Sequence, residues 1–182
     1  MAAITSSLSA KPQLRPLNIL RDLPAVASLV ETCFASTMDE DGRRYIQQMR
    51  RAGQDNAFLR WAVSAVDTAS MPLSGYVWEE GGELIGNVSV IPYRHAKRKY
   101  YLIANVAVRE EHRRRGIGRA LTLAALEHAR LRAAAEIWLH VRDDNPGAIE
   151  LYRSLGFAEL ARRTTWQAAP DRQAGAKVPG RV

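Results

Sequence analysis

The sequence predicts an α/β layered fold in which one mixed sheet packs against helices. Its 182 residues suit a single domain. Three β runs follow one another after short turns, at Gly75–Glu79, Glu83–Ile91 and Tyr100–Val108. A long helical segment, Gly116–Ala135, then separates Tyr100–Val108 from a further apolar run, Glu136–Val141. Because a strand–helix–strand crossover joins parallel strands, we expect Tyr100–Val108 and Glu136–Val141 to form a parallel pair.

The two ends of the chain and its first elements have distinct patterns. Residues 1–12 and 168–182 are small, polar and aperiodic, so we expect a flexible N-terminal tail and a disordered C-terminal tail. Leu14–Leu20 is typical of a strand. Asp22 then offers a helix cap, and apolar residues at spacings of three and four predict an amphipathic helix over Pro24–Ala35.

Two segments before the β runs have helical character. Asp39–Arg51 is rich in charge and ends before Gly53, which predicts a second helix. Asn56–Val66 has a weaker helical pattern that leaves its assignment open.

Glycine and proline indicate the remaining boundaries. Glu80–Gly82 predicts a hairpin turn, because glycine readily adopts the positive φ that such turns need. Pro92 is expected to end the strand that precedes it. Pro146–Leu155 is typical of a helix closed by Gly156, and Phe157–Trp166 is expected to form a last strand.

The formal net charge of +7 comes from one segment. Residues 94–119 contain nine Lys or Arg residues and two acidic residues, a surplus of seven, so the rest of the chain balances. Such a local field indicates an anionic partner, and both nucleic acid and a polyphosphate cofactor fit it.

Several observations bear on the compartment. No stretch approaches the roughly 20 apolar residues of a membrane span, and Met1–Ala10 lacks the basic and apolar parts of a signal peptide. Cys33 is the only cysteine, which suits a reducing environment. We therefore expect a cytoplasmic protein that does not bind a membrane.

The strongest motif is Arg113-Arg-Arg-Gly-Ile-Gly118, between a predicted strand and a predicted helix. Unpaired amides and the partial positive charge of a helix start bind phosphate, and glycines allow a close approach. No Walker A loop is present, and Leu121 stands where a dinucleotide fingerprint needs Gly or Ala.

A second motif lies downstream, at Leu139–Phe157, and contains Asn145, Ala148-Ile149, Leu151-Tyr152 and Gly156-Phe157. Together the two motifs resemble the signatures of the GNAT (GCN5-related) N-acetyltransferase family. The second is similar to bacterial ribosomal-protein N-terminal acetyltransferases.

The resemblance implies a fold and a cofactor. The GNAT fold has a mostly antiparallel sheet, helices on both faces and a central parallel strand pair that splays to bind acyl-CoA, here within residues 13–167. It implies a pantetheine site on Val106, Ala107 and Val108 and a pyrophosphate site on the amides of Arg114–Arg119, including Gly116, Ile117 and Gly118. Arg113, Arg114 and Arg115 would supply positive charge, and Asn145 would contact the cofactor.

Tyr152 is the first catalytic candidate. Its family counterpart points at the cofactor sulfur, where a phenol can protonate the departing thiolate. The alternative is a purely packing role beside the apolar residues of its helix.

His140 is the second catalytic candidate, as a general base in the predicted strand. In the bacterial relatives a Glu occupies the equivalent position. A neutral imidazole at about pH 7 could accept a proton from the amine, although a histidine bonded within the fold fits equally well. Asn87, another polar residue in an apolar strand, either faces solvent or contacts substrate.

These residues predict an N-acetyltransferase that uses acetyl-CoA to acetylate a primary amine, on a protein N-terminus or a small molecule. A non-catalytic acyl-CoA-binding or regulatory domain is the alternative. A nucleic-acid-binding module is disfavoured, because exposed aromatics do not interleave with the basic residues. No Cys/His cluster has metal-ligand spacing, so we expect no metal. Dimers are common in the family, so a homodimer is one option.

Overall fold

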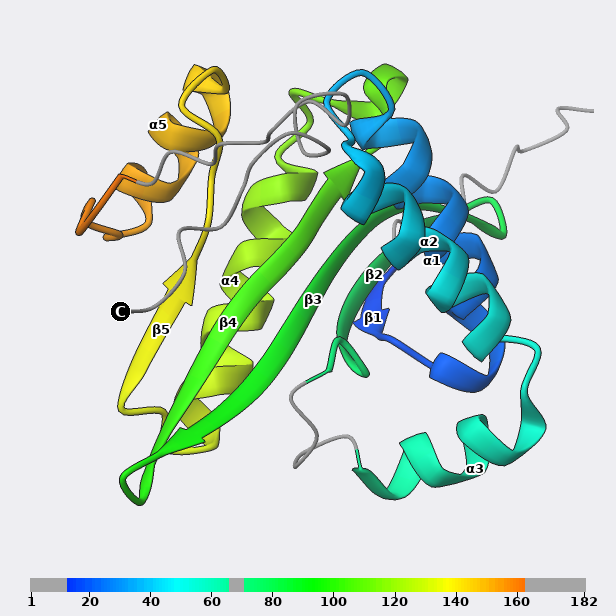
Figure 1. Ribbon diagram of the computed structural model, residues 1–182. Coiled ribbons are helices and arrows are strands. Elements are labelled where there is room, and N and C mark those ends of the chain that lie inside the picture. The colour runs from blue at the N-terminus through cyan, green and yellow to red at the C-terminus, as the bar shows by residue number, and fades with distance from the viewer. Residues whose placement is uncertain (1–12, 66–70, 163–182) are drawn as a thin grey trace, which may run out of the picture.

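The computed structural model describes residues 13–65 and 71–162, and these form one five-stranded sheet with helices against both faces (Figure 1). The strands are β1 (Gln13–Pro16), β2 (Ser74–Glu80), β3 (Glu83–His95), β4 (Arg98–Val108) and β5 (Glu136–Leu139), and they lie in the sheet in chain order. Neighbours are antiparallel except β4 and β5, which are parallel. The mixed sheet and the predicted parallel pair are therefore confirmed.

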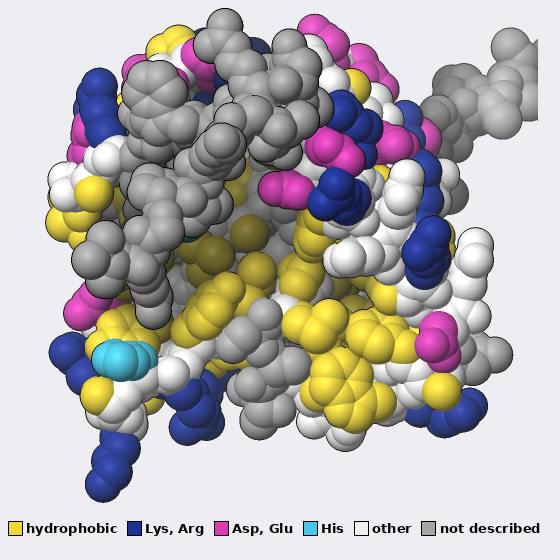
Figure 2. Space-filling model, in the orientation of Figure 1, with side chains coloured by type: hydrophobic (Ala, Val, Ile, Leu, Met, Phe, Trp, Pro, Cys, Tyr) yellow, Lys and Arg dark blue, Asp and Glu magenta, His cyan; other side chains and the backbone are white. Residues whose placement is uncertain are grey.

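The helices are α1 (Ile19–Phe34), α2 (Glu40–Ala52), α3 (Asn56–Ala65), α4 (Ile117–Leu131) and α5 (Pro146–Ser154), with a short 3-10 helix at Glu110–His112. Side chains alternate across the sheet: Leu84 joins the core under α1 and α2, whereas its neighbour Ile85 joins the core under α4. In Figure 1, α4 lies behind the sheet. On the face toward the viewer, hydrophobic side chains gather in a hollow over β3 and β4, beside α2 (Figure 2). None of the helices in the described ranges has the length and apolar character of a membrane span.

The first helix begins earlier than predicted. The Asn18 side chain accepts a hydrogen bond from the Leu20 amide (3.1 Å), so Asn18 caps α1 and the expected strand ends at Pro16. Asp22 is not a cap but lies buried in the first turn, where it pairs with Arg15. An earlier capping residue and this buried ion pair explain why the helix starts five residues upstream of the expected position.

The third strand does not end at Pro92. β3 continues to His95, and Pro92 pairs with Tyr101 on β4. Pairing with β2 begins only at Val90, so β3 has no neighbour on that side at Pro92 within the described residues. A proline is tolerated there because its missing N–H leaves no ladder bond unmade.

The C-terminal part also differs from expectation. β5 ends at Leu139 rather than Val141, α4 ends at Leu131 rather than Ala135, and residues 157–162 form no strand. Glu159 instead pairs locally with Arg153 and Arg162. Residues 163–166 of the predicted strand and both predicted tails lie outside the described residues. β5 is consequently the last strand of the sheet in the described ranges, so the parallel pair lies at its edge.

A bulge in β4 separates the parallel pair. Asn87 on β3 is paired with Ala107 and Ser89 with Ala104, so Asn105 and Val106 together oppose Val88 alone. Asn105 adopts a left-handed conformation, with φ 50°. Pairing of β4 with β5 ends two residues before Asn105, at Ile103↔Leu139. The two strands therefore diverge, as the resemblance implied, and bulges commonly bend a strand in this way.

Candidate functional site

An open cleft of about 660 Å³ lies where β4 leaves β5. It is lined by the end of α1 and the next loop (Cys33, Phe34, Ser36, Thr37), the end of β4 (Val106, Ala107, Val108), the loop and first turn of α4 (His112, Arg113, Arg114, Gly116, Ile117, Gly118, Arg119) and the α5 region (Arg142, Asp144, Asn145, Gly147, Ala148, Glu150, Leu151, Tyr152, Ser154). The volume falls within the usual range for small-molecule sites. Most of the predicted site residues, from three separate segments, therefore meet in one place, and the end of α1 adds a fourth segment that was not predicted.

The start of α4 presents free backbone amides to this cleft. Gly116 is the N-cap in a left-handed conformation (φ 80°) and, having no side chain, provides no side-chain cap. The first turn holds no acidic residue, and the amides of Ile117, Gly118 and Arg119 precede the first intrahelical bond, which Ala120 makes to Gly116. A β-carbon at Gly116 would meet no atom within 4 Å, so the space beside it is open. The arrangement fits an anion such as pyrophosphate.

The three consecutive arginines before α4 point in different directions. Arg113 and Arg114 line the cleft, as does Arg119. Arg115 does not line it: its guanidinium donates to both carboxylate oxygens of Glu80, at 3.0 and 3.1 Å. That bond lowers the pKa of Glu80. The sequence expectation that Arg115 contacts phosphate lacks support from the geometry, because its side chain is already engaged by the β2 carboxylate.

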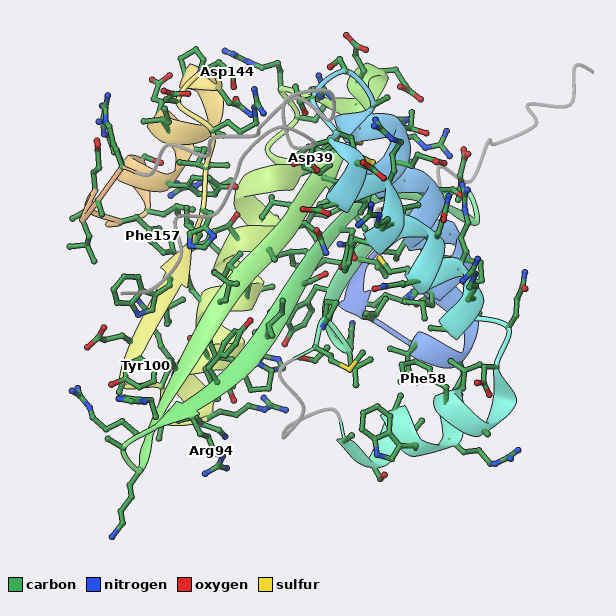
Figure 3. All side chains as sticks on the ribbon, viewed as in Figure 1. Asp39, Phe58, Arg94, Tyr100, Asp144 and Phe157 are labelled. Atoms are coloured by element: carbon green, nitrogen blue, oxygen red, sulfur yellow. The ribbon has the colours of Figure 1, made fainter. Side chains whose placement is uncertain are left out.

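The basic segment is divided between two regions. Figure 3 shows Arg94, in the β3–β4 hairpin, and Asp144, at the cleft, at opposite ends of the sheet. Within the basic segment, the arginines that line the cleft are therefore those that follow β4.

Arg113 and Cys33 connect the α1 wall of the cleft to its strand floor. The Arg113 side chain donates from Nε to the Val108 carbonyl oxygen (3.2 Å). Burial raises the pKa of the Cys33 thiol, although the nearby Arg113 guanidinium opposes that shift. Cys33 packs against the core under α1, as expected, and also lines the cleft.

Tyr152 on α5 lies at the cleft with 8% of its surface exposed. Burial raises the pKa of its phenol, so the hydroxyl is protonated at neutral pH. In the described part of the chain, no side chain or backbone group hydrogen-bonds this hydroxyl. Tyr152 thus packs against Phe157 and also lines the cleft.

Asn145 lines the cleft but its side-chain oxygen already has a partner. Oδ1 accepts a hydrogen bond from the Ala148 amide (3.1 Å) and so caps α5. Its amide nitrogen is the group left to contact a ligand. Capping explains an Asn at this position without any cofactor.

His140 lies apart from the cleft lining. β5 ends at Leu139, so His140 is not in the strand that was predicted to orient it, and it is exposed. Strand alternation therefore gives no indication of its direction.

The α1 wall of the cleft was not predicted from the sequence. Phe34, Ser36 and Thr37 are far from the two motifs in the chain and match no pattern that indicates a ligand. Asn105, next to the predicted strand floor, was also missed, although an Asn within a β-branched run is a usable signal of a bulge. In the described residues, no group of three or more His, Cys, Asp or Glu side chains could hold a metal ion.

Comparison with known proteins places the chain among acetyltransferases. The model of the acetyltransferase (GNAT) family matches residues 32–157. The ribosomal protein bS18-alanine N-acetyltransferase of Escherichia coli K12 is 40% identical over 67 residues, which are 37% of this chain and 45% of that protein. A mycothiol acetyltransferase of Thermobispora bispora is 50% identical over 52 residues, 29% of this chain and 18% of that protein. The matches thus span less than half of these relatives.

A solved structure supports the same fold. The GCN5-related N-acetyltransferase from Ralstonia eutropha JMP134 superposes with a TM-score of 0.61 and 24% identity, over 87% of this chain and 99% of that chain. The family model covers most of the chain, including both motifs, the end of β4 and α5. The chain therefore belongs to the acetyltransferase (GNAT) family.

Proposed function

We propose that this protein is an N-acetyltransferase that transfers the acetyl group of acetyl-CoA to a primary amine by direct attack on the thioester. The observation that carries the proposal is the uncapped start of α4, which opens into a cleft that also holds the buried Tyr152 phenol. The first feature suits the pyrophosphate of CoA and the second suits protonation of its thiolate.

Acetyl-CoA would bind along the diverging end of β4. Within the described residues, Val106, Ala107 and Val108 have no β5 partner, so their backbone edge is available to pantetheine, as for an added strand. The first-turn amides of α4 would hold the pyrophosphate, with Arg113, Arg114 and Arg119 as further cations. Arg113 would release the Val108 carbonyl to do so.

The chemistry requires two proton movements. As the amine nitrogen bonds to the acetyl carbonyl carbon, the carbon–sulfur bond breaks and the sulfur leaves as a thiolate. Tyr152 would give its proton to that thiolate, and a base would take a proton from the amine. Because burial raises the pKa of Tyr152, the phenol holds the proton until the thiolate forms.

The proposed general base is His140. His140 carries an imidazole that can accept a proton, but it is exposed and does not line the cleft, so a water molecule would have to link it to the amine. A His140→Ala variant with lower kcat and unchanged acetyl-CoA affinity would support the role, and unchanged kcat would remove it.

The acceptor amine is a protein N-terminus or a small molecule. One relative is named for the alanine of ribosomal protein bS18 and another for mycothiol. An α-amine has a pKa near 8, against about 10.4 for lysine, so a weak base suffices for an N-terminal acceptor. Turnover on matched panels of peptides and small amines would distinguish the two classes. The cytoplasmic location and the homodimer stay predictions.

Calorimetric titration of acetyl-CoA and of CoA tests the proposal directly. We expect micromolar Kd values, which correspond to about 8 kcal/mol of binding free energy. Absence of binding would overturn the assignment of the cleft. Binding without acetyl transfer to any amine of either panel would instead favour the alternative, a non-catalytic acyl-CoA-binding domain.

A further inference from the structure

A partly buried polar cluster lies at the bulge of β4, one residue before the strand floor of the cleft. The Asn105 amide donates from Nδ2 to the Tyr45 hydroxyl (2.7 Å) and to Ser89 Oγ (3.2 Å). The backbone carbonyl of Asn105 accepts from Asn87 Nδ2 (3.0 Å). Three elements, α2, β3 and β4, therefore meet at one asparagine through four polar residues.

Asn87 replaces a hydrogen bond that the bulge removes. Its side chain is fully buried, which excludes the solvent-facing role considered from sequence. An extra residue in one strand breaks the regular ladder and leaves backbone groups without strand partners. By donating to the Asn105 carbonyl, Asn87 satisfies one of these groups and stabilises the bulge in its observed position.

The conformation of Asn105 determines where β4 goes next. Its positive φ is a conformation that asparagine tolerates better than most other residues. Two residues before it, Ile103 makes the last pair with β5, and immediately after it Val106–Val108 line the cleft. A change in the backbone at Asn105 would therefore alter the direction of the edge that we expect to meet pantetheine.

Tyr45 connects this bulge to the helical wall of the cleft. Tyr45 lies on α2 and packs against the core under α1, and the C-terminal end of α1 contributes Cys33 and Phe34 to the cleft. Tyr45 and Asn105 are both half-buried, and burial raises the pKa of the Tyr45 phenol, although its bond to Asn105 opposes the shift. The Tyr45–Asn105 bond thus joins the bulge to α2, which packs against the same core as α1.

We propose that Asn105 is a positioning residue for the acyl donor, held by Tyr45, Ser89 and Asn87. It acts through the backbone of Val106–Val108 and touches neither acetyl-CoA nor the amine. The inference rests on the proposed function, because it assumes that acetyl-CoA binds this edge of β4.

Two variants probe the cluster from its two sides. Asn105→Gly keeps access to positive φ but removes the amide, and Tyr45→Phe removes only the acceptor hydroxyl. We expect the Kd for acetyl-CoA to rise about tenfold in Asn105→Gly and about threefold in Tyr45→Phe, with the KM for the amine unchanged. In the double variant the Kd should match that of Asn105→Gly alone, because the bond that Tyr45→Phe removes is already absent in Asn105→Gly.

A matched control separates positioning from general stability. Ser74 makes a buried hydroxyl bond to the Val90 carbonyl (2.7 Å) in the same sheet but does not line the cleft. Ser74→Ala should lower the Tm while leaving the Kd for acetyl-CoA within twofold.

The outcomes are distinguishable. Failure of the wild-type protein to bind acetyl-CoA would overturn the proposed function and the inference together. Normal wild-type binding, with unchanged Kd in both Asn105→Gly and Tyr45→Phe, would overturn the inference alone. If Asn105→Gly does not fold, Tyr45→Phe against Ser74→Ala decides the matter: an equal Kd in these two variants would reject the positioning role.

Discussion

The ring of Tyr152 stands edge-on to the ring of Phe157, with their centroids 6.0 Å apart and their planes at 71°. This contact holds the phenol by its ring, so removal of the hydroxyl alone should leave the packing in place. We expect Tyr152→Phe to lower kcat about 100-fold, the lower end of typical general-acid effects. Steady-state kinetics would measure kcat. Calorimetry would measure the Kd for CoA, which should stay within twofold of the wild-type value. A kcat equal to that of the wild type would leave Tyr152 with a packing role only.

Alkaline pH should affect stability through the same residue. A group whose pKa is raised in the folded state contributes stability below its unfolded pKa, near 10 for Tyr, and loses it as pH rises through the folded pKa. Burial raises the pKa of Tyr152. Urea titrations from pH 8 to 11 should therefore show the wild type losing unfolding free energy relative to Tyr152→Phe above about pH 10. A constant difference across that range would contradict the buried, neutral phenol.

The glycines of the phosphate loop should respond differently to alanine. Gly116 has φ 80°, so Gly116→Ala should cost about 1–2 kcal/mol of unfolding free energy by backbone strain alone. We also expect its Kd for CoA to rise about tenfold, because the first-turn amides would shift.

Gly118→Ala is the matched change. A β-carbon there would make ordinary contacts with Leu151 (3.6 Å) and Val108 (3.9 Å), and its φ is not positive. Alanine is favoured over glycine within a helix, so the free energy of unfolding of this variant should be about 0.5 kcal/mol higher than that of the wild type. Chemical denaturation of both variants measures the contrast, and equal destabilisation would show that strain is not the cause.

Neutralising single arginines should distinguish those that contribute to CoA binding from Arg115, which binds the Glu80 carboxylate on β2. Arg114→Gln and Arg119→Gln should each raise the Kd for CoA about fivefold at low salt, with the effect decreasing as salt rises. Arg115→Gln should change it less than twofold, because Glu80 already binds that guanidinium. Titrations at two ionic strengths provide the test. An increase in the Kd for CoA in Arg115→Gln as large as in the other two variants would mean that Arg115 leaves Glu80 when CoA binds.

The buried pair of Arg15 and Asp22 should contribute strongly to stability. Asp22 has 3% of its side chain exposed and accepts from Arg15 at 2.6 Å. Removing one partner of a buried pair costs about 3–5 kcal/mol, so Arg15→Met should lower the unfolding free energy by about 3 kcal/mol. Arg44→Met, which breaks an exposed pair with Glu40, should leave the unfolding free energy nearly unchanged, because water screens that pair.

The same pair predicts sensitivity to acid. Burial would raise the pKa of Asp22, but hydrogen bonds from Arg15, the Asn18 amide and Arg21 outweigh it and lower the pKa. A lowered pKa stabilises the fold above the unfolded value, near 3.9, and that stability is lost as pH falls through the folded pKa. Unfolding followed between pH 6 and 2 should show the wild type losing stability relative to Asp22→Asn below about pH 4. Parallel curves would argue that Asp22 does not titrate in this way.

Elements determined by neighbouring residues were predictable. Alternation and turn residues indicated β2, β4 and the hairpin at Glu80–Gly82, whose Gly81 and Gly82 have positive φ. The spacing of a strand, a glycine-rich loop and a long helix predicted the loop at Gly116 and the start of α4. Errors arose where the tertiary arrangement overrode a local signal. Pro92 stays in β3 because no β2 residue pairs with it, and Asp22 pairs with Arg15 instead of capping a helix.

The sequence by itself determined the GNAT family, the parallel strand pair and the residues that form the loop before α4, because these depend on local backbone preferences and on two short motifs. Only the tertiary structure decided which side chains serve the cleft. It directs Arg115 to Glu80, 35 positions away, puts His140 beyond the end of β5, brings the end of α1 to the cleft and joins Tyr45 to Asn105 across 60 positions. A side chain takes the partner that folding brings near it, and that partner is not specified by the residues beside it in the chain.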